Sequence, residues 1–374
     1  MQFTPLKKVY FKTFGCRTNL FDTQVMISNL KSYKITNNDF DADMIVVNSC
    51  TVTNGADTGV RSYINQIKRK NPKASIYMTG CGVTTQGETL FEEKELAGVF
   101  GHSQKEKIDD FLDREDRFFD AGSLTHVDNT IVSEFVGKTR AFIKIQEGCD
   151  FECSYCIIPS VRGKARSHNE DKIIEQIRTL ADNGFGEFIL TGTNVGSYGM
   201  DQNSSIAKLL KKMSLIKGVR RIRIGSLEPI QIDAEFLELL SEPWMARHLH
   251  IALQHTSDEM LKRMLRRNTY SNDLPLFEKI ASHGYALGTD YIVGFPGETD
   301  ALWHKAITRV KELPLTHVHA FSYSKRSGTP AATMKPEIRG DIAKLRHKEL
   351  SDIIKAKNLS FRESLTTPLS LLVE

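Results

Sequence analysis

The 374-residue sequence lacks the segments that would carry it into or across a membrane. No apolar run reaches the 18 or more residues that a membrane-spanning helix needs. The N-terminal stretch MQFTPLKKVY has no apolar core of the kind found in secretion signals. We therefore expect a cytoplasmic protein with no membrane partner.

A strong excess of one charge is also missing. The 50 Lys and Arg residues nearly balance the 46 Asp and Glu residues, and the net charge of +4 permits a nucleic-acid partner without requiring one. Low-complexity segments and short-period repeats are absent, which excludes repeat arrays and disordered tracts. With 40% hydrophobic and 26% charged residues, the composition is that of a globular chain long enough for two domains.

Cysteine is scarce, but its placement is informative. The chain has only 6 cysteines, and they form two groups of three. One group is spread along the first 81 residues and the other lies within residues 149–156. In a reducing compartment such cysteines are thiols or metal ligands rather than disulfides. The two triads are Cys16, Cys50 and Cys81, and Cys149, Cys153 and Cys156.

Residues 1–120 read as alternating strands and helices. Apolar segments predict strands at 8–14, 44–48 and 75–79, and helical patterns follow near 20–32, 57–70 and 90–97. This order predicts an α/β domain with a doubly wound parallel sheet. Each cysteine of the first triad directly follows one strand. Because the carboxyl ends of parallel strands share one edge, the three thiols are expected to meet there.

Residues 121–139 show no period and are expected to be a linker, after which a second βα series fills residues 140–364 and ends in a helix over 333–364. Six βα units predict a partial (β/α)6 TIM-like barrel with its chemistry at the carboxyl ends of the strands. We expect strands at 141–145, 187–191, 221–225, 249–253, 289–293 and 317–321, with helices at 171–182, 205–213, 233–241, 257–266, 274–282 and 300–311.

The second triad has the spacing CxxxCxxC at the end of the first barrel strand. Three thiolates on so short a loop can hold three irons of a 4Fe–4S cluster and leave the fourth iron open. The alternative is a zinc knuckle, but a structural zinc site needs four ligands. The next histidine, His168, lies well beyond the loop, so the cluster interpretation is favoured.

The stretch IQEGCDFECSYCIIPSVRGKARS (145–167) closely resembles the radical S-adenosylmethionine (SAM) motif of the methylthiotransferase family. The resemblance extends over residues 8–365 and implies that SAM binds the open iron and is cleaved to a 5′-deoxyadenosyl radical. It also implies SAM contacts from TGTNVGSYG, GSLEP, the Gln of LQHTSDEMLKRM, and DYIVGFPGE. The candidates are Thr191, Gly192, Thr193, Asn194, Ser226, Glu228, Gln254, Val293 and Gly294.

The segments KTFGCRTN, VVNSCTVT and MTGCG around the first triad resemble the N-terminal domain of the same family. That resemblance implies a second 4Fe–4S cluster on Cys16, Cys50 and Cys81, with sulfur or a methylthio group at its open iron. Asn19 and Asn48 are weaker candidates for lining this pocket, since asparagine is common in turns. The alternative is that the three cysteines are ordinary buried residues with no metal.

The resemblance further implies two uses of SAM, one as methyl donor to a cluster-bound sulfur and one as radical source, with electrons from a flavodoxin or ferredoxin. FKTFGCRTN and IIPSVRGKARS look most like the branch that modifies C2 of N6-threonylcarbamoyladenosine, 3′ of the anticodon in tRNA. Branches acting on isopentenyladenosine or on a ribosomal-protein aspartate stay open, as does a non-catalytic iron–sulfur or zinc protein that binds RNA. The sequence departs from the family pattern after Gln254, at His255 and Thr256.

A tRNA partner predicts basic surface. Candidate phosphate contacts are Arg61, Lys68, Arg69, Lys70 and Lys73, a run that also fits a solvated helix face, and Arg162, Lys164 and Arg166, which directly follow the second triad. The family usually ends in a small RNA-binding β-barrel, and the resemblance implies that residues 365–374 are the first strand of such a barrel.

Overall fold

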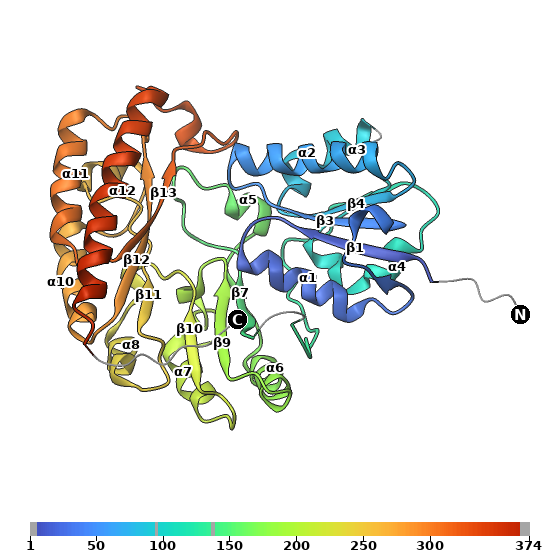
Figure 1. Ribbon diagram of the computed structural model, residues 1–374, viewed down its shortest axis with the longest axis horizontal. Coiled ribbons are helices and arrows are strands. Elements are labelled where there is room, and N and C mark those ends of the chain that lie inside the picture. The colour runs from blue at the N-terminus through green and yellow to red at the C-terminus, as the bar shows by residue number, and fades with distance from the viewer. Residues whose placement is uncertain (1–5, 94–95, 136–138, 367–374) are drawn as a thin grey trace, which may run out of the picture.

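The computed structural model describes residues 6–93, 96–135 and 139–366. The N-terminal domain is built on one parallel six-stranded sheet with the strand order β2-β1-β3-β4-β5-β6 (Figure 1). Its strands are β1 (Lys8–Thr13), β2 (Lys34–Ile35), β3 (Met44–Ser49), β4 (Ser75–Gly80), β5 (Gly98–Phe100) and β6 (Phe118–Asp120). The three predicted strands are β1, β3 and β4. The other three have only two or three residues, too few to show a period in the sequence.

Helices cover both faces of this sheet. On one face Met26 of α1 (Arg17–Asn29) and Phe111 of α4 (Ile108–Leu112) pack against alternate side chains of the strands, such as Val46. On the other face Ile64 of α2 (Asn54–Lys70) packs with Leu90 of α3 (Glu88–Glu92) against the remaining strand side chains. Both faces of β3 are therefore buried, as expected for a parallel strand. The predicted doubly wound sheet is confirmed.

The rest of the chain forms a half-barrel of six parallel strands. They are β7 (Ala141–Glu147), β9 (Glu187–Gly192), β10 (Arg221–Ile224), β11 (His248–His250), β12 (Ala286–Val293) and β13 (His317–Ser322). Single bridges, one of them Leu227–Ile251, join the two sheets of this half-barrel between β10 and β11. A short antiparallel strand, β8 (Arg166–Ser167), pairs with β7. The predicted partial barrel of six strands is confirmed.

Helices line the outer face of the half-barrel and close its core (Figure 1). Side chains from these helices, such as Phe277 and Val310, pack with alternate strand residues, such as Leu249 and Leu287. The helices of this half are α5 (Ile158–Arg162), α6 (Glu170–Asp182), α7 (Ile206–Ser214), α8 (Ala234–Glu238), α9 (Asp258–Arg263), α10 (Tyr270–Ser282), α11 (Asp300–Glu312) and α12 (Gly340–Glu363).

The final helix starts later than predicted. α12 begins at Gly340 rather than at residue 333, and the preceding residues form a short 3-10 turn at Pro330–Thr333 and then an irregular segment. Pro336 has no backbone N–H to donate and disfavours helical geometry in the residue before it, so the helix begins only after this proline. Of the strand expected over 365–374, residues 367–374 lie outside the described residues.

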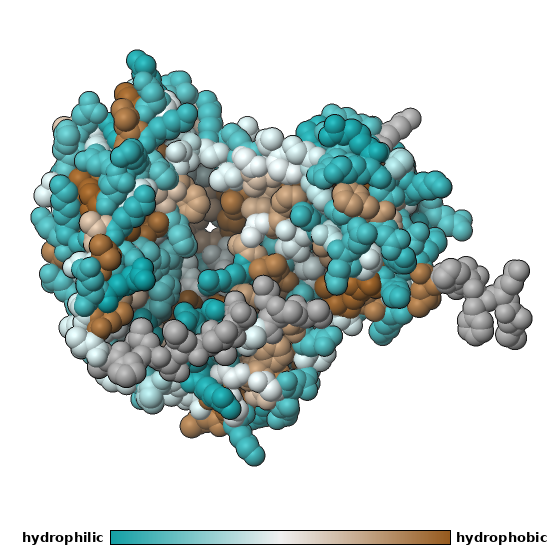
Figure 2. Space-filling view, viewed as in Figure 1, coloured by the Kyte–Doolittle hydropathy of each residue, from teal (hydrophilic) through white to brown (hydrophobic). Residues whose placement is uncertain are grey.

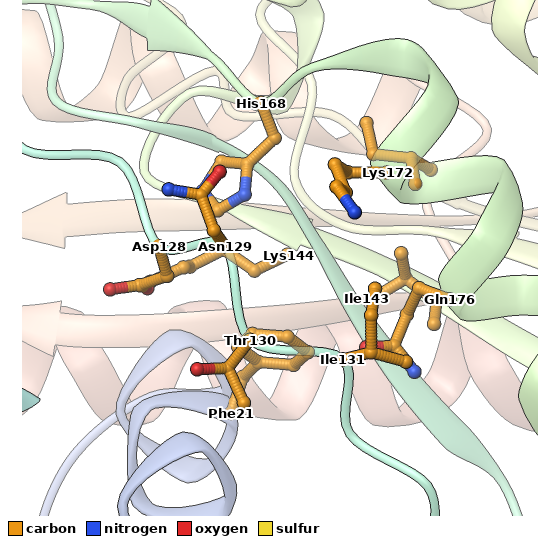
Figure 3. A pocket seen from close by; sticks show the side chains of 11 residues that line it. Phe21, Asp128, Asn129, Thr130, Ile131, Ile143, Lys144, His168, Lys172 and Gln176 are labelled. Atoms are coloured by element: carbon orange, nitrogen blue, oxygen red, sulfur yellow. The ribbon is translucent and has the colours of Figure 1, made fainter. Parts of the chain in front are cut away.

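The segment expected to be a linker has no helix or strand in its described part, residues 121–135, but it is fixed in place. Val132 and Phe135 are buried in the barrel core. The Gln176 amide exchanges two hydrogen bonds with the backbone of Val132, with the Val132 N–H donating over 2.6 Å. Figure 3 shows linker residues such as Asn129 and Thr130 beside a small pocket that His168 and Lys144 also line. The linker therefore contributes to the junction between the two halves.

His168 is expected to make the protein sensitive to mild acid. Burial, followed by the charge of Lys144, lowers the pKa of His168 to about 4, below its usual value of about 6.5. The stabilising effect of a neutral His168 is complete above pH 6.5 and is lost as the pH falls toward 4. Between pH 7 and pH 5 this loss is about 2 kcal/mol in the free energy of unfolding.

Urea unfolding at both pH values should show that His168→Gln removes this part of the pH dependence. His283 is exposed and serves as the control, so His283→Gln should leave the pH dependence unchanged. Equal pH dependence in the parent and in His168→Gln would contradict the assignment.

None of the helices in the described ranges is both long enough and apolar enough to cross a lipid bilayer.

Candidate functional site

The first cysteine triad lies at the carboxyl edge of the N-terminal sheet. Cys16 follows β1 and precedes α1, Cys50 follows β3, and Cys81 follows β4. Gly15 adopts a positive φ of 96° and lies so close to Cys50 that a Cβ atom there would come within 2.8 Å of its sulfur. Cys16 is exposed, whereas Cys50 and Cys81 are buried. The structure therefore brings all three predicted residues to one edge of the sheet.

Asn19 and Asn48 hold these loops together. The Asn19 amide donates to the carbonyls of Phe14 (2.8 Å) and Ser49 (2.9 Å), and so links the loop of Cys16 to the strand that ends at Cys50. The Asn48 amide donates to the Asn19 carbonyl over 2.8 Å. Both side chains are 1% exposed. Asn48 also donates to the Thr23 hydroxyl over 3.0 Å, and Asn19 accepts from Arg162, so both residues hold the loops around the triad together. Their suggested role in lining the pocket stays a prediction.

The second triad lies on the loop that follows β7. The Phe151 N–H donates to the Cys149 sulfur over 3.4 Å, and the Asn194 amide approaches the same sulfur at 3.6 Å. The Arg266 guanidinium donates to the Cys153 sulfur over 3.7 Å. Hydrogen bonds of this kind favour thiolates over thiols. The loop is therefore fixed against the carboxyl ends of the neighbouring strands.

The unliganded thiols resist ionisation. Burial raises the pKa of Cys81 to about 11 and that of Cys156 to about 12, and it also raises the pKa values of Cys50 and Cys149. Thiolates in such places need a compensating positive charge, which a metal centre supplies. The donor set of each triad therefore fits a metal cluster.

Thiol spacing distinguishes a cluster from a single zinc ion. Tetrahedral zinc with bonds of about 2.3 Å holds its sulfurs about 3.8 Å apart. Among the described residues, the groups of three or more His, Cys, Asp or Glu ligand atoms within 4.8 Å of one another contain no cysteine. In each triad at least two sulfurs therefore lie more than 4.8 Å apart, which suits a 4Fe–4S cluster, in which each thiolate binds a different iron.

The two triads meet at helix α5. Cys81 packs against Ile157, the residue after Cys156, and against Val161 of α5. Arg162, at the end of α5, donates from Nε to the Cys81 sulfur over 3.2 Å. In Figure 1 this helix lies between the N-terminal domain and the half-barrel. The loop that carries one triad thus directly contacts a cysteine of the other.

Arg162 is not available for phosphate binding, which corrects the expectation from sequence. It is 2% exposed and bonds to Glu147, to Asn19 and, over 3.0 Å, to Asp22. Arg166 is partly buried and donates to carbonyls, including that of His126 over 2.8 Å. Of the three basic residues beside the second triad only Lys164 is exposed. In the other basic run, Arg61 pairs with Glu93 at 3.0 Å, and Arg69, Lys70 and Lys73 are exposed.

The candidate SAM residues after β9 lie beside Cys149. The Asn194 N–H donates to Gln146 over 2.8 Å, while its side-chain oxygen is buried without a partner. Thr193 accepts from the Gly148 N–H over 3.3 Å, and Thr191 lies 3.4 Å from Thr18 of the N-terminal domain. The unpartnered oxygen of Asn194 is suited to accept from a bound ligand. Gly192 is partly exposed between them.

After β10, Ser226 is exposed and Glu228 is half-buried. Arg266 donates to both carboxylate oxygens of Glu228, with one distance of 2.9 Å, and so orients Glu228 beside Cys153. Burial alone would lower the pKa of the Arg266 guanidinium. Glu228 and the other neighbours of Arg266 outweigh burial and raise this pKa. Sequence analysis missed Arg266, because no spacing pattern connects it with either partner.

Three further candidates lie at the ends of β11 and β12. Gln254 has a φ of 67°, and its backbone bonds to Asp290 and Ile292. Val293 is 0% exposed, and its carbonyl accepts from the Tyr323 N–H over 2.8 Å. The Gly294 N–H donates to Glu298 over 2.8 Å.

His255 and Thr256, where the sequence departs from the family pattern, are buried. His255 bonds to Glu298 at 3.1 Å, and Thr256 bonds to Tyr291 at 3.0 Å. Both residues therefore serve packing within the half-barrel.

The molecule is hollowed between its two halves. Figure 2 shows the hollow at the centre of one face, between the β13 side of the half-barrel and the N-terminal domain. Direct bonds join the halves at its margin, where Arg326 donates to Thr51 over 2.8 Å and pairs with Asp57 at 2.7 Å. A substrate could therefore approach between two halves that are held in a fixed relation.

Known proteins match both halves of the chain. Residues 8–101 match the Uncharacterized protein family UPF0004 and residues 143–310 match the Radical SAM superfamily, so each match contains one triad. A Helicobacter pylori protein named "Putative methylthiotransferase" is 57% identical over 99% of this chain and 89% of its own length. The Threonylcarbamoyladenosine tRNA methylthiotransferase MtaB of Bacillus subtilis is 37% identical, covering 88% of this chain and 76% of its own.

The corresponding MtaB protein of Aquifex aeolicus is 35% identical, covering 95% of this chain and 90% of its own length. Among solved structures, the radical S-adenosylmethionine methyltransferase TsrM from Kitasatospora setae aligns with a TM-score of 0.67 at 14% identity, covering 88% of this chain and 74% of that chain. At this low identity the structural match supports the fold alone.

Proposed function

The chain belongs to the radical SAM methylthiotransferase family, and we propose that it adds a methylthio group to C2 of N6-threonylcarbamoyladenosine, 3′ of the anticodon in tRNA. The relatives that carry this activity in their names span most of the chain at 35% and 37% identity. The enzyme class follows from the family, whereas the base is our proposal. We place the enzyme with tRNA in the cytoplasm and expect a flavodoxin or ferredoxin as its electron donor.

One structural observation supports a division of labour between two clusters. SAM and one 4Fe–4S cluster follow from the radical SAM family. We propose that Cys149, Cys153 and Cys156 hold that cluster, and that Cys16, Cys50 and Cys81 hold a second one. Cys81 belongs to one buried cluster with Ile157 and Val161, and Arg162 donates to its sulfur over 3.2 Å, which supports placing the two sites next to each other. Clusters held there would supply the sulfur and the electron close to one substrate.

The chain's own residues would bind and orient the reactants. Bound at these sites, the two clusters and two SAM molecules would supply the electron, the sulfur and the methyl group. The buried oxygen of Asn194 would accept a hydrogen bond from SAM, and Glu228, oriented by Arg266, would accept another from its ribose or ammonium group. Close packing of the two halves around Arg162 would exclude water from the shared site.

Deleting the gene is expected to remove the methylthio group from threonylcarbamoyladenosine in tRNA and to leave the unthiolated nucleoside in its place. Mass spectrometry of digested tRNA would measure both nucleosides, and the parent gene, but not a Cys153→Ala copy, should restore the product. Loss of methylthio groups from isopentenyladenosine, or from a ribosomal-protein aspartate, would overturn the proposed substrate and leave the enzyme class intact.

A further inference from the structure

A group of histidines on the half-barrel is left unused by this function. His248 and His250 alternate on β11, and His317 and His319 alternate on β13. Asp290 lies on β12 between them, in register with His319. Because neighbouring strand residues such as Leu249 and Leu287 pack into the core beneath the helices, the alternating histidines lie on the opposite, inward face.

Three of these side chains have the geometry of a metal site. His250 Nε2 lies 3.1 Å and His319 Nδ1 lies 3.4 Å from the same oxygen of Asp290. All three ligand atoms lie within 4.8 Å of one another. A tetrahedral zinc ion with bonds of about 2.0–2.1 Å separates its ligand atoms by about 3.3 Å. Both distances from Asp290 are close to this separation.

We propose that His250, Asp290 and His319 bind a divalent transition-metal ion of the Zn²⁺ class. Two imidazoles and one carboxylate form a donor set suited to Zn²⁺ and its neighbours, and less suited to Mg²⁺ or Ca²⁺, which prefer oxygen. Three protein ligands leave one tetrahedral position for water or for an oxygen of a bound ligand. His319 is exposed, so this position is open to solvent.

Two further histidines lie beside this site. His248 and His317 bond to each other through their Nε2 atoms at 2.8 Å. These two imidazoles are therefore engaged with each other, whereas Asp290 is paired with His250 and His319.

Three other histidine–carboxylate groups lie in the described part of the chain, and a lysine contacts at least one carboxylate in each of them. They are Asp22, His102 and Glu147; Asp128, Glu147 and His168; and Glu106, His126 and Asp128. The ammonium of Lys144 contacts Asp22, Asp128 and Glu147. Asp290, by contrast, forms ion pairs only with histidines in the part of the chain that the structure describes. Among the four groups in the described residues, the site on the inward face is thus the one that no lysine contacts.

Zinc binding to the intact holoenzyme tests the proposal. After anaerobic dialysis against metal-free buffer, titration with Zn²⁺ followed by calorimetry should show one site per chain, and the zinc should be retained on desalting. The double variant His250→Ala/His319→Ala should lose this site, and Asp290→Asn should bind at least tenfold more weakly. The matched control His283→Ala removes an exposed histidine outside the cluster and should bind like the parent.

Iron content, measured in the same samples, must stay constant, so that zinc entering the cysteine sites is recognised by a loss of iron. Circular dichroism of each variant separates loss of a ligand from loss of fold. Two results would overturn the proposal. One is that the parent retains no zinc at about 100 μM Zn²⁺, a concentration well above the dissociation constants of structural zinc sites. The other is that the parent and the folded double variant retain equal amounts. Neither outcome bears on the methylthiotransferase activity, which the cysteine variants test separately.

Discussion

Replacing Cys16 by alanine is expected to abolish methylthiolation while reductive cleavage of SAM continues. Cys16 lies between β1 and α1 and is not part of the loop of residues 149–156. Without its third thiolate the proposed second cluster cannot be held, so iron should fall from about eight to about four per chain. The remaining cluster keeps all three of its cysteines. Mass spectrometry of anaerobic reactions would measure 5′-deoxyadenosine and the modified nucleoside side by side.

Cys153→Ala gives the opposite pattern and is the matched control. Cys153 is a buried member of the second triad, and its loss should abolish both SAM cleavage and methylthiolation. Both variants lose one cysteine sulfur, but from different triads. A difference between them therefore cannot come from the loss of a thiol in general. If the modified nucleoside still forms in Cys16→Ala, the proposed division of labour between the clusters is wrong.

The sequence was sufficient to predict where the cysteines gather. In a parallel sheet every strand ends at the same edge, so the strand positions before Cys16, Cys50 and Cys81 brought these residues together without any knowledge of side-chain contacts. The same rule placed Cys149 after β7 and Asn194 after β9. Predictions that depend on strand ends therefore agreed with the structure. The predicted start of α12 did not agree, because a proline sets where that helix begins.

Partners that are distant in the chain could not be predicted. Arg162 follows a cysteine loop and reads as an exposed phosphate ligand, but it is buried because Glu147, Asp22 and the Cys81 sulfur surround it. Arg266 is oriented toward Glu228 by the fold alone. The sequence does not show which residue a charged side chain pairs with. Burial of that side chain becomes favourable only when its partner is in place.

The histidine cluster did leave a signal in the sequence. HLH at 248–250 and HVH at 317–319 place histidines two residues apart in strands, and therefore on one face. The sequence did not show the register of β12 against β13. Only the pairing of His319 with Asp290 brings a carboxylate between the two histidine strands. A period-two pattern of metal-ligating residues on neighbouring strands thus indicates a site before its third member is known.

Asp22→Asn is expected to lower the free energy of unfolding by about 3–5 kcal/mol, because it leaves three buried cations, Lys105, Lys144 and Arg162, with only the carboxylates of Asp128 and Glu147. Asp22 of α1 lies 2.6 Å from both Lys105 and Lys144, and 3.0 Å from Arg162, and all four side chains are buried. Burial alone would raise the pKa of Asp22, but these cations outweigh it and lower that pKa well below its usual value. The substitution keeps the shape of the side chain and removes only its charge.

The stabilising effect of Asp22 is therefore present above its unfolded pKa of about 3.9 and is lost as the pH falls through the lower folded value. Urea unfolding at pH 7 measures the full effect. Asp41→Asn is the control, since the ion pair of Asp41 with Lys8 is exposed and should contribute less than about 1 kcal/mol.

A second substitution separates charge from packing. Lys144 joins the half-barrel to Asp22 of the N-terminal domain, so Lys144→Met in the Asp22→Asn background removes the excess positive charge of the buried network. If the destabilisation comes from uncompensated charge, the double variant should regain part of the loss, and the two substitutions should be non-additive by more than about 0.5 kcal/mol. Strictly additive losses would mean that Asp22 acts through packing alone. In that case the two halves would be held together by contacts other than this buried network.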